Sequence, residues 1–191
     1  MATRLITPAS SSVVSLSEAK AHLNVDHSDD DVYIESIVNS STDYAQKFTG
    51  RAFLTQTWDL VIDEFPEDGI FIPFPPLSQV LGVYYLNSDG NEVILDSGMY
   101  EVDAYSEPGW VVPVSSGWPT TLDSINAVRV RFVAGWSTVN DIPSSIRAAV
   151  LLLTGTLYET RETVVIGQVP IKMPWSAEQL LRQYRVETSI A

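Results

Sequence analysis

The feature of this sequence that most limits its fold is a change of residue pattern at Gly50 and a change back near Asp141. Before Gly50 and after Asp141, apolar residues recur every three or four positions, as they do on amphipathic helices. Between them, short β-branched and aromatic runs alternate with Gly and Pro, which is typical of antiparallel strands joined by turns. The sequence therefore predicts an α+β fold: a helical bundle from N- and C-terminal segments with an inserted antiparallel β module.

The same changes of pattern set the expected boundaries within the 191 residues. We expect an N-terminal arm over 1–14, a helical core from 15–50 together with 141–186, a β insertion over 51–140, and a C-terminal tail over 187–191. The arm is polar and contains a run of serines, so no core element is expected there.

Two helices are predicted before the β insertion. Ser15 stands three residues before Glu18, which is the spacing of a capping box, and it begins a short helix to about Leu23. Ser28 and the acidic run at 29–31 begin a longer helix, because carboxylates favour the positive N-terminal end of the helix dipole. Gly50 ends this helix at the position where a left-handed residue is common.

Two more helices are predicted after the insertion. Pro143 suits a first helical turn, and the helix that follows is apolar nearly all round, as are helices buried in a core or an assembly. A loop is expected over 164–174, and Ser176 with Gln179 predicts the cap of a final helix to about Tyr184. The core and subunit-packing residues expected on these helices are Ile34, Ile37, Val38, Tyr44, Phe48, Ile146, Val150, Leu153, Leu157 and Tyr158.

Six or seven short strands are expected within the β insertion, and their order in the sheet is left open. The candidate runs are 55–62, 70–72, 80–86, 92–95, 100–102, 110–112 and 127–133. This spacing favours an antiparallel sheet or small barrel over the βαβ alternation of a parallel sheet.

The negative charge of the chain is concentrated in the β insertion. The chain has 24 acidic and 11 basic residues, a formal net charge of −13. Residues 51–126 contain twelve acids and a single base, Arg51, whereas 127–191 contain five acids and seven bases. A chain this acidic is a poor general binder of nucleic acid, which requires clustered Lys or Arg. For any single acid, the simplest interpretation is a solvated surface that aids solubility.

The residue inventory excludes most cofactor and metal sites. The chain has no cysteine and two histidines, so disulfides, thiolate metal sites and thiol nucleophiles are excluded. The best metal candidate is the group His22, Asp26, His27 and Asp29–Asp31, but its spacing matches no known metal-binding loop, and helix capping explains the same acids. No cofactor and no metal are expected. No apolar run is long enough to span a bilayer, so no membrane partner is expected.

The alternative function is a secreted carbohydrate-binding or glycosidase-like β module. Its candidate carboxylate pairs are Asp63/Glu64, Glu67/Asp68 and Glu101/Asp103, and its candidate sugar platforms are Trp58, Trp110, Trp118, Trp136 and Trp175. However, adjacent acids in a strand point to opposite faces, and tryptophans at strand positions usually belong to a core. Nucleophile-elbow and nucleotide-binding motifs do not occur, so no catalytic residue and no enzymatic activity are predicted.

A series of motifs in a fixed order resembles one protein family. They are Ser-Leu-Ser-Glu-Ala-Lys-Ala-His-Leu at 15–23, Asp-Asp-Asp at 29–31, Phe-Thr-Gly-Arg-Ala-Phe-Leu-Thr-Gln-Thr-Trp at 48–58, Pro-Pro-Leu at 75–77, Asn-Ser-Asp-Gly at 87–90, Val-Arg-Phe-Val-Ala-Gly-Trp at 130–136, Asp-Ile-Pro-Ser-Ser-Ile-Arg-Ala-Ala at 141–149, Leu-Tyr-Glu-Thr-Arg-Glu at 157–162, Pro-Trp at 174–175 and Leu-Leu-Arg-Gln-Tyr-Arg-Val at 180–186. In this respect residues 14–186 resemble the head–tail connector (adaptor) proteins of tailed double-stranded DNA bacteriophages. The likeness is to a longer subgroup with a β insertion, which also occurs in prophages and gene transfer agents.

The resemblance implies a structural subunit of the virion neck, made in the host bacterial cytoplasm. Members form a homo-oligomeric ring of about twelve copies in closed cyclic symmetry. The implied partners are the portal protein on one side and a stopper or tail-completion protein on the other. Double-stranded DNA passes the channel without specific binding, and we expect acids of the long helix or the β module to line that channel.

The resemblance also places portal docking at the C-terminal segment. The expected docking residues are Trp175, Leu180, Leu181, Arg182, Tyr184 and Arg185. They combine apolar and aromatic anchors with two guanidinium groups that can pair with acids of a partner. The competing interpretation is that this helix packs on residues 33–48 of its own subunit.

Overall fold

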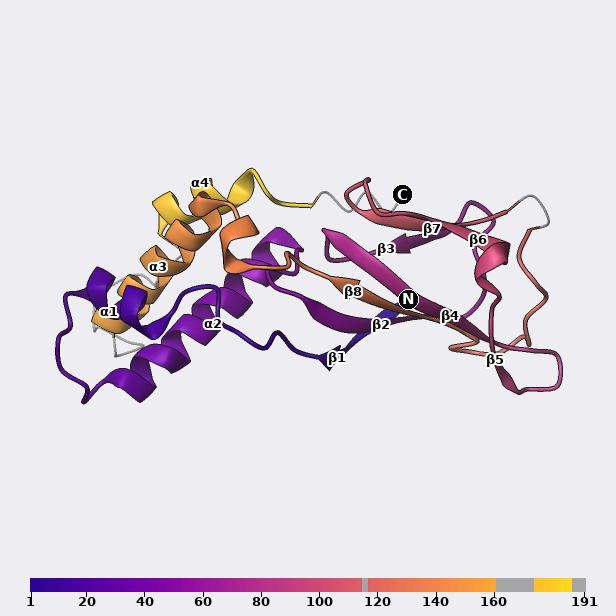
Figure 1. Cartoon of the computed structure of the whole chain (residues 1–191), viewed down its shortest axis with the longest axis horizontal. Helices are drawn as coiled ribbons and strands as arrows, with labels where there is room; N and C mark the ends of the chain where they lie inside the picture. The colour runs from indigo at the N-terminus through magenta and orange to yellow at the C-terminus, as the bar shows by residue number, and fades with distance from the viewer. Residues whose placement is uncertain (115–116, 161–173, 187–191) are drawn as a thin grey trace, which may run out of the picture. The chain divides into compact units, whose positions relative to one another are not determined.

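The chain folds into two compact units, each built from two stretches of sequence. The structure is a computed structural model that describes residues 1–114, 117–160 and 174–186. The β unit comprises Met1–Ser10 and Leu54–Ser137, and the helical unit comprises Ser11–Phe53 and Thr138–Ala191. Figure 1 shows strands and helices segregated along the chain in this way, which confirms the predicted α+β class.

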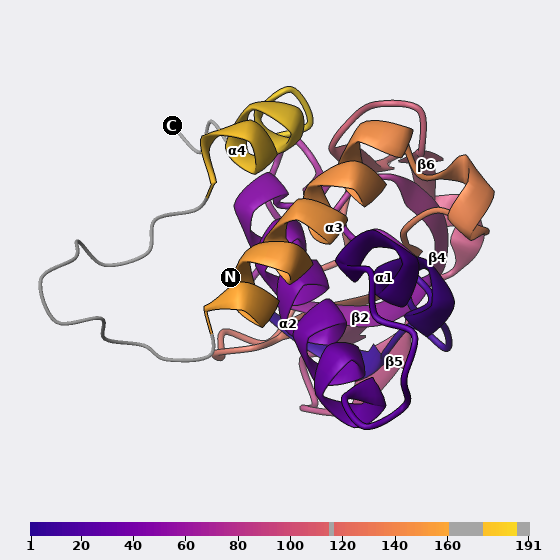
Figure 2. The same cartoon turned by 90° about the vertical axis from the view of Figure 1, so that its left-hand side faces the viewer.

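The helical unit contains four α-helices and one short 3-10 turn among its described residues. They are α1 (Leu16–Leu23), α2 (Asp31–Thr49), the 3-10 turn η2 (Val139–Asp141), α3 (Ser144–Glu159) and α4 (Trp175–Arg182). Helix α3 packs on both α2 and α4, and α1 contacts α2 and α3. Figure 2 shows α3 lying between α4 and α1, across the long helix α2.

The start of α1 and the end of α2 follow local rules that the sequence predicts. The Ser15 side chain accepts a hydrogen bond from the backbone N–H of Glu18, and the Glu18 carboxylate accepts one from the backbone N–H of Ser15. This confirms the capping box. At Gly50, φ is +70°, the left-handed conformation that most readily ends a helix when the residue carries no Cβ.

The acids before α2 have a different role from the one expected. Helix α2 begins at Asp31, and Asp30, the residue before it, makes no side-chain capping bond. Instead, the Tyr158 hydroxyl donates to the Asp30 carboxylate at 2.6 Å, and the Lys20 ammonium lies 2.6 Å from the Asp31 carboxylate. The two acids thus tie α2 to α3 and to α1, and only Asp31 lies within the first turn of α2.

The predicted cap of the last helix is wrong. Helix α4 begins at Trp175, directly after Pro174, so Ser176 lies inside its first turn and no side chain caps its N-terminus. Pro143 likewise precedes α3 instead of occupying its first turn. The loop expected over 164–174 falls almost entirely on residues 161–173, outside the described part of the chain, as does the tail over 187–191.

The expected core residues of the helices divide into buried and exposed groups. Those buried are Ile34, Ile37, Val38, Ile146, Val150 and Leu153. Phe48 and Tyr158 are half-buried. Tyr44 and Leu157 are 48% and 39% exposed, so they do not belong to the core of this unit; a role for them in subunit packing stays a prediction.

The β unit consists of two antiparallel sheets. Its strands are β1 (Ala2–Thr7), β2 (Gln56–Ile62), β3 (Ile70–Ile72), β4 (Leu77–Leu86), β5 (Glu92–Ile94), β6 (Tyr100–Asp103), β7 (Gly109–Pro113) and β8 (Val128–Ala134), with a 3-10 turn η1 (Ser97–Met99) before β6. One sheet has the order β1-β2-β8-β4-β5, and the other has the order β3-β7-β6. Figure 1 shows the three-stranded sheet as a separate layer over the larger one.

The core of the β unit lies between these two sheets. Alternate residues of β8 are buried, among them Val130 and Phe132, because successive side chains of a strand point to opposite faces. At Gly109 of β7, a Cβ atom would lie 2.6 Å from the Leu77 side chain and 2.9 Å from the backbone carbonyl oxygen of Asp103. A residue without a side chain is therefore required at this position of β7.

The first residues of the chain are ordered, contrary to the expected arm over 1–14. Ala2–Thr7 forms β1, which pairs antiparallel with β2 at the edge of the larger sheet. Val13 and Val14 are buried in the helical unit at 2% and 1% exposure. Every residue of β1 is exposed, so the strand carries no alternation of buried and exposed positions by which the sequence could reveal it.

Candidate assembly surfaces

Part of the C-terminal segment is bound to its own helical unit. Leu181 is fully buried, and the Tyr184 hydroxyl lies 2.8 Å from the hydroxyl of Ser145 on α3. The Arg51 guanidinium donates to the backbone carbonyl of Tyr184 at 2.6 Å. Of the expected docking residues, Leu181 and Tyr184 therefore serve to attach α4 to α3 and to the end of α2.

The opposite side of α4 is open. Trp175 is 75% exposed, Arg182 is exposed, and Leu180 is half-buried. Arg185 is also exposed, with its guanidinium 5.9 Å from the centre of the Phe48 ring. Trp175 and Arg182 lie seven residues, or about two turns, apart on the same side of α4. Tryptophan and arginine are both enriched among the residues that contribute most to binding at protein interfaces. We call Trp175 and Arg182 the α4 surface.

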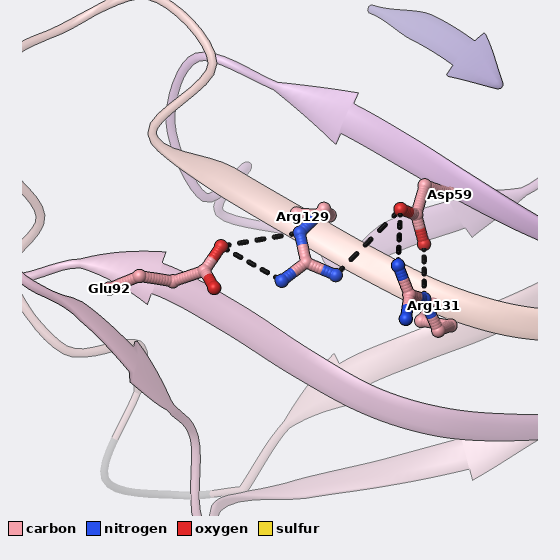
Figure 3. Close-up of polar contacts among 4 residues, drawn as sticks. All are labelled: Asp59, Glu92, Arg129 and Arg131. Carbon is pink, nitrogen blue, oxygen red and sulfur yellow. Dashed lines mark hydrogen bonds and ion pairs between the residues drawn. The ribbon is translucent and has the colours of Figure 1, made fainter.

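The β unit has its own cluster of charged side chains on the outer face of the larger sheet. Asp59 on β2 is 5% exposed and lies directly opposite Arg131 on β8. The Arg131 guanidinium donates to both carboxylate oxygens of Asp59, at 2.7 and 2.9 Å (Figure 3). Arg129 lies two residues along the same strand and therefore on the same face; it donates to Glu92 at 2.8 Å and lies 3.8 Å from Asp59.

These contacts fix the protonation state of the buried carboxylate. Hydrogen bonding from Arg131 is the largest influence on Asp59, and it holds the pKa of that carboxyl below its usual value although burial acts in the opposite direction. Arg129 and Arg4 add favourable electrostatic attraction. A carboxylate held in this state is a weak base, so it is poorly suited to acid–base chemistry. The cluster instead connects strands β1, β2, β8 and β5.

The β unit contains many more acidic residues than basic ones. The unit contains twelve acidic residues and three basic ones, Arg4, Arg129 and Arg131, and all three arginines act on Asp59. Apart from Asp59 and Glu92, ten acids remain, and they lie in turns and in β6. They are Asp63, Glu64, Glu67, Asp68, Asp89, Asp96, Glu101, Asp103, Glu107 and Asp123.

Several of these acids gather at the end of the unit where β2 stops. Asp63 and Glu64 follow β2 and line one shallow pocket together with residues 121–125. The Asp63 carboxylate accepts the backbone N–H of Asn126 at 2.8 Å, which joins the two segments. We call residues 63–68 the acidic loop; its four acids, Asp63, Glu64, Glu67 and Asp68, are all exposed.

The acidic loop is held in place by aromatic packing. The rings of Phe65 and Trp118 stack with centroids 4.6 Å apart and an interplanar angle of 7°. The Trp118 indole N–H also donates to the backbone carbonyl of Pro66 at 2.9 Å. Phe65 thus points inward while the acids on either side of it remain at the surface.

Three of the candidate tryptophans and one of the candidate acids make structural contacts within the β unit. Trp58, Trp110 and Trp118 pack on the rings of Phe74, Phe71 and Phe65. The Asp103 carboxylate accepts from Ser106 and from the backbone of the turn that follows β6, and these hydrogen bonds lower its pKa. These groups stabilise the β unit itself.

Two further kinds of site, a metal-binding cluster and a membrane-spanning helix, are absent from the described residues. No group of three or more His, Asp or Glu side chains within them is placed to hold a metal ion. No helix among them is long and apolar enough to cross a membrane.

The first part of the chain is similar to a known protein family. Residues 13–89, which span α1, α2 and strands β2 to β4, match the family described as phage gp6-like head–tail connector proteins. Over these residues the chain is a match to the head–tail connector family. The resemblance found in the sequence is thereby confirmed. Among curated proteins, none matches the chain significantly.

Solved structures resemble nearly the whole chain. A chain from a structure described as "Neck of empty GTA particle computed with C6 symmetry" superposes with a TM-score of 0.81 at 17% identity, covering 97% of this chain and 96% of that one. A chain of the "Virion of native gene transfer agent (GTA) particle" gives 0.79 at 16% identity with the same coverage. A third, from "Neck of native GTA particle computed with C12 symmetry", gives 0.73 at 19% identity, again with 97% and 96% covered. At these identities the likeness establishes the fold.

Sequence reasoning found some of the candidate surface residues and missed others. It singled out Trp175 and Arg182, which the structure exposes, because they combine an aromatic ring and a positive charge in one helix. It did not single out the Asp59–Arg131 pair, because the two residues are 72 positions apart and meet only through the pairing of β2 with β8. The alternation of Arg129 and Arg131 with buried residues of β8 is the signal that could have pointed to the pair.

Proposed function

We propose that this chain is a structural head–tail connector subunit in the neck of a tailed phage or a gene transfer agent particle. One observation carries the proposal: a connector-family match over residues 13–89 lies within a fold that superposes on neck and virion chains over 97% of the sequence. Both units of the chain take part in that superposition, so the likeness extends beyond a common helical hairpin.

The subunit works as part of a closed ring. Two of the similar chains come from necks computed with six-fold and twelve-fold symmetry, which supports a ring of about twelve copies here. In a cyclic ring, each copy contacts its neighbours through two different surfaces. Tyr44 and Leu157, the exposed members of the expected packing set, are candidates for such a contact.

The α4 surface is the portal-docking site in this proposal. Trp175 offers a large apolar area, and Arg182 offers a guanidinium that pairs with carboxylates in a planar, two-pronged geometry. Leu181 no longer belongs to the docking set, because it is buried in its own unit, whereas Leu180 and Arg185 can contribute at the margin of the surface.

The acidic surplus of the β unit suits a surface that faces passing DNA or lies near it. Each Lys or Arg that contacts phosphate adds affinity and would retard the duplex, whereas unpaired carboxylates repel it. Repeated around a ring, the acidic loop would give the channel a negative wall and let double-stranded DNA pass without specific binding. A stopper or tail-completion protein would close the opposite face of the ring.

A purely structural role accounts for the site better than the glycosidase alternative does. Three of the five tryptophans considered as sugar platforms, Trp58, Trp110 and Trp118, pack on phenylalanines of the same unit. The Asp103 carboxylate is bound by its own turn. The connector role needs no bound cofactor and no turnover, and it uses the surfaces that remain open.

Removal of the gene from its phage or particle-producing host tests this function. We expect DNA-filled heads without tails, because connectors join the packaged portal to the tail, and we expect the wild-type gene to restore tailed particles. Normal tailed particles in the absence of the chain would contradict the proposal. Electron microscopy and infectivity or gene-transfer titre are the measurements.

The same complementation assay tests the α4 surface. A gene with Trp175→Ala and Arg182→Glu should express a folded chain yet fail to restore tails, because the partner loses both the apolar anchor and the charge pair. Ser36→Ala, at an exposed position of α2, is the control and should complement fully. Full complementation by the double variant would remove portal docking from this surface.

A further inference from the structure

The attachment of β1 differs from that of every other strand of the larger sheet. All six of its residues are exposed, and it contributes no side chain to the core. What binds it is the backbone ladder to β2, which runs from the pair Ala2 and Val61 to the pair Thr7 and Thr57. Arg4 adds electrostatic attraction to Asp59, which already has two hydrogen bonds from Arg131. Strand β1 can therefore leave the sheet without opening the core.

The covalent connection of β1 also sets it apart. Residues 1–10 cluster with the β unit, but the chain passes directly from there into the helical unit, at Ser11. The connecting segment 8–12 is Pro-Ala-Ser-Ser-Ser, which is polar and exposed at four of its five positions. Fully extended, five residues reach about 17 Å. The strand is thus tethered to one unit while it pairs with the other.

An open β2 edge accepts only a strand that restores the same contacts. When β1 leaves, the backbone N–H and C=O groups along the β2 edge lose their partners, and Asp59 loses the electrostatic attraction of Arg4. The β1 strand of a second copy supplies an identical ladder and an identical arginine. Exchange between two copies therefore leaves the number of hydrogen bonds unchanged, which is the condition under which domain swapping costs little.

We infer that β1 is exchanged in the assembled ring: the β1 strand of each copy pairs with β2 of the neighbouring copy. This inference rests on the proposed ring. A free chain favours its own strand, because the tether keeps that strand at high effective concentration. The ring places a second β2 edge at a fixed position, where the exchanged strand links each copy to the next. Closed symmetry then leaves no β2 edge unpaired.

The exposed apolar side chains of β1 fit this arrangement. Leu5 and Ile6 of β1 are 42% and 38% exposed, although they are the kind of side chain that folding normally buries, and Met1, just before the strand, is 66% exposed. Leu5 lies opposite Trp58. In an exchanged strand these side chains lie at the junction between two copies, where a neighbouring surface covers them.

The absence of cysteine from the chain permits a direct test. Two chains are made, one with Ala2→Cys and the other with Val61→Cys, and equal amounts are mixed, assembled into rings and oxidised. Because each chain has one cysteine, a bond between residues 2 and 61 forms only between two copies. About half of the Ala2→Cys chains should form this mixed dimer, since half of their neighbours carry the partner cysteine in a random ring. The mixture oxidised before assembly should show none.

A matched pair distinguishes exchange from simple contact between sheet edges. Ile94→Cys lies on β5, at the opposite edge of the same sheet, and replaces Val61→Cys in the control mixture. No dimer between residues 2 and 94 is expected. Rings that show this dimer, or rings without the dimer between residues 2 and 61, overturn the exchange while the ring itself stands. Failure of the cysteine-free chain to form any ring overturns the proposed function as well.

A locked chain gives the second readout. The double variant Ala2→Cys/Val61→Cys, oxidised as a free chain, closes the β1–β2 ladder within one molecule. We expect at least a tenfold loss of ring assembly for the oxidised form and full recovery when the bond is reduced. Locked chains that assemble as well as reduced ones would contradict the exchange.

Discussion

At the scale of single residues, the Asp59–Arg131 pair is the most constrained interaction of the β unit. Asp59 is almost completely buried on an outer sheet face, and two arginines of β8 cover it. The pair occurs between two directly opposite residues of adjacent strands, where cross-strand contacts contribute most to a sheet. Its loss would leave guanidinium groups without their acid, which costs more than the pair itself contributes.

Asp59→Asn should therefore destabilise the β unit by about 2–4 kcal/mol at neutral pH. The Asp59 pKa is lower in the folded chain than its ordinary value of 3.8, so the carboxylate contributes stability above pH 3.8 and loses that contribution as the pH falls through the folded-state pKa. The difference between wild type and variant should shrink over this acidic range. Urea unfolding followed by tryptophan fluorescence measures it, because four of the five tryptophans lie in the β unit.

Asp89→Asn is the control for this prediction, since it removes the same charge at an exposed turn. It should change stability by less than about 0.5 kcal/mol. A difference between Asp59→Asn and wild type that does not vary with pH would show that the ion pair is not the cause.

At the scale of elements, local sequence signals predicted most helices and strands. The features that they missed depend on contacts between residues far apart in the sequence. The capping box at Ser15 and the glycine after α2 act within one turn, so the sequence alone reveals them. Strand β1 is visible only through its pairing with β2, more than 50 residues away. Likewise, Asp30 appeared to cap a helix because its partner, Tyr158, belongs to α3.

The decrease in burial toward the C-terminal end of α3 can be tested with two leucines that lie one turn apart on the same side of the helix. Leu153→Ala should destabilise the helical unit by about 2–5 kcal/mol, because Leu153 is 7% exposed and its removal leaves a cavity. Leu157→Ala should cost less than about 1 kcal/mol, because Leu157 is 39% exposed. Urea unfolding followed by far-UV circular dichroism gives both values. Equal losses would contradict the assignment of Leu157 to the surface.

At the scale of the whole molecule, the charge distribution predicts how a ring treats DNA. The chain has a net charge of −13, and the arginines of the β unit are used within one cluster. Composition alone predicted the acidic module, because the counts of Asp and Glu are read directly from the sequence. The positions of the acids in turns required the strand order, which the sequence leaves open.

Rings of the wild-type chain should not bind duplex DNA, whereas rings with the four acids of the acidic loop replaced by lysine should bind it. The affinity of the variant should fall steeply with added salt, because each new phosphate contact releases counterions. Gel-shift titration of purified rings with duplex DNA at several salt concentrations measures this. The same four-lysine change placed in the helical unit, at Asp26, Asp29, Glu159 and Glu178, is the control and should have a smaller effect. Equal DNA binding by both variants would remove the acidic loop from the channel wall.

The central claim is that this chain forms a ring in the neck of a particle, and imaging of intact particles tests it most directly. Electron microscopy of purified particles, at a resolution that shows helices, should reveal about twelve copies of this fold between the portal and the tail. Particles whose neck contains no copy of this fold, although they are tailed and carry DNA, would contradict the account.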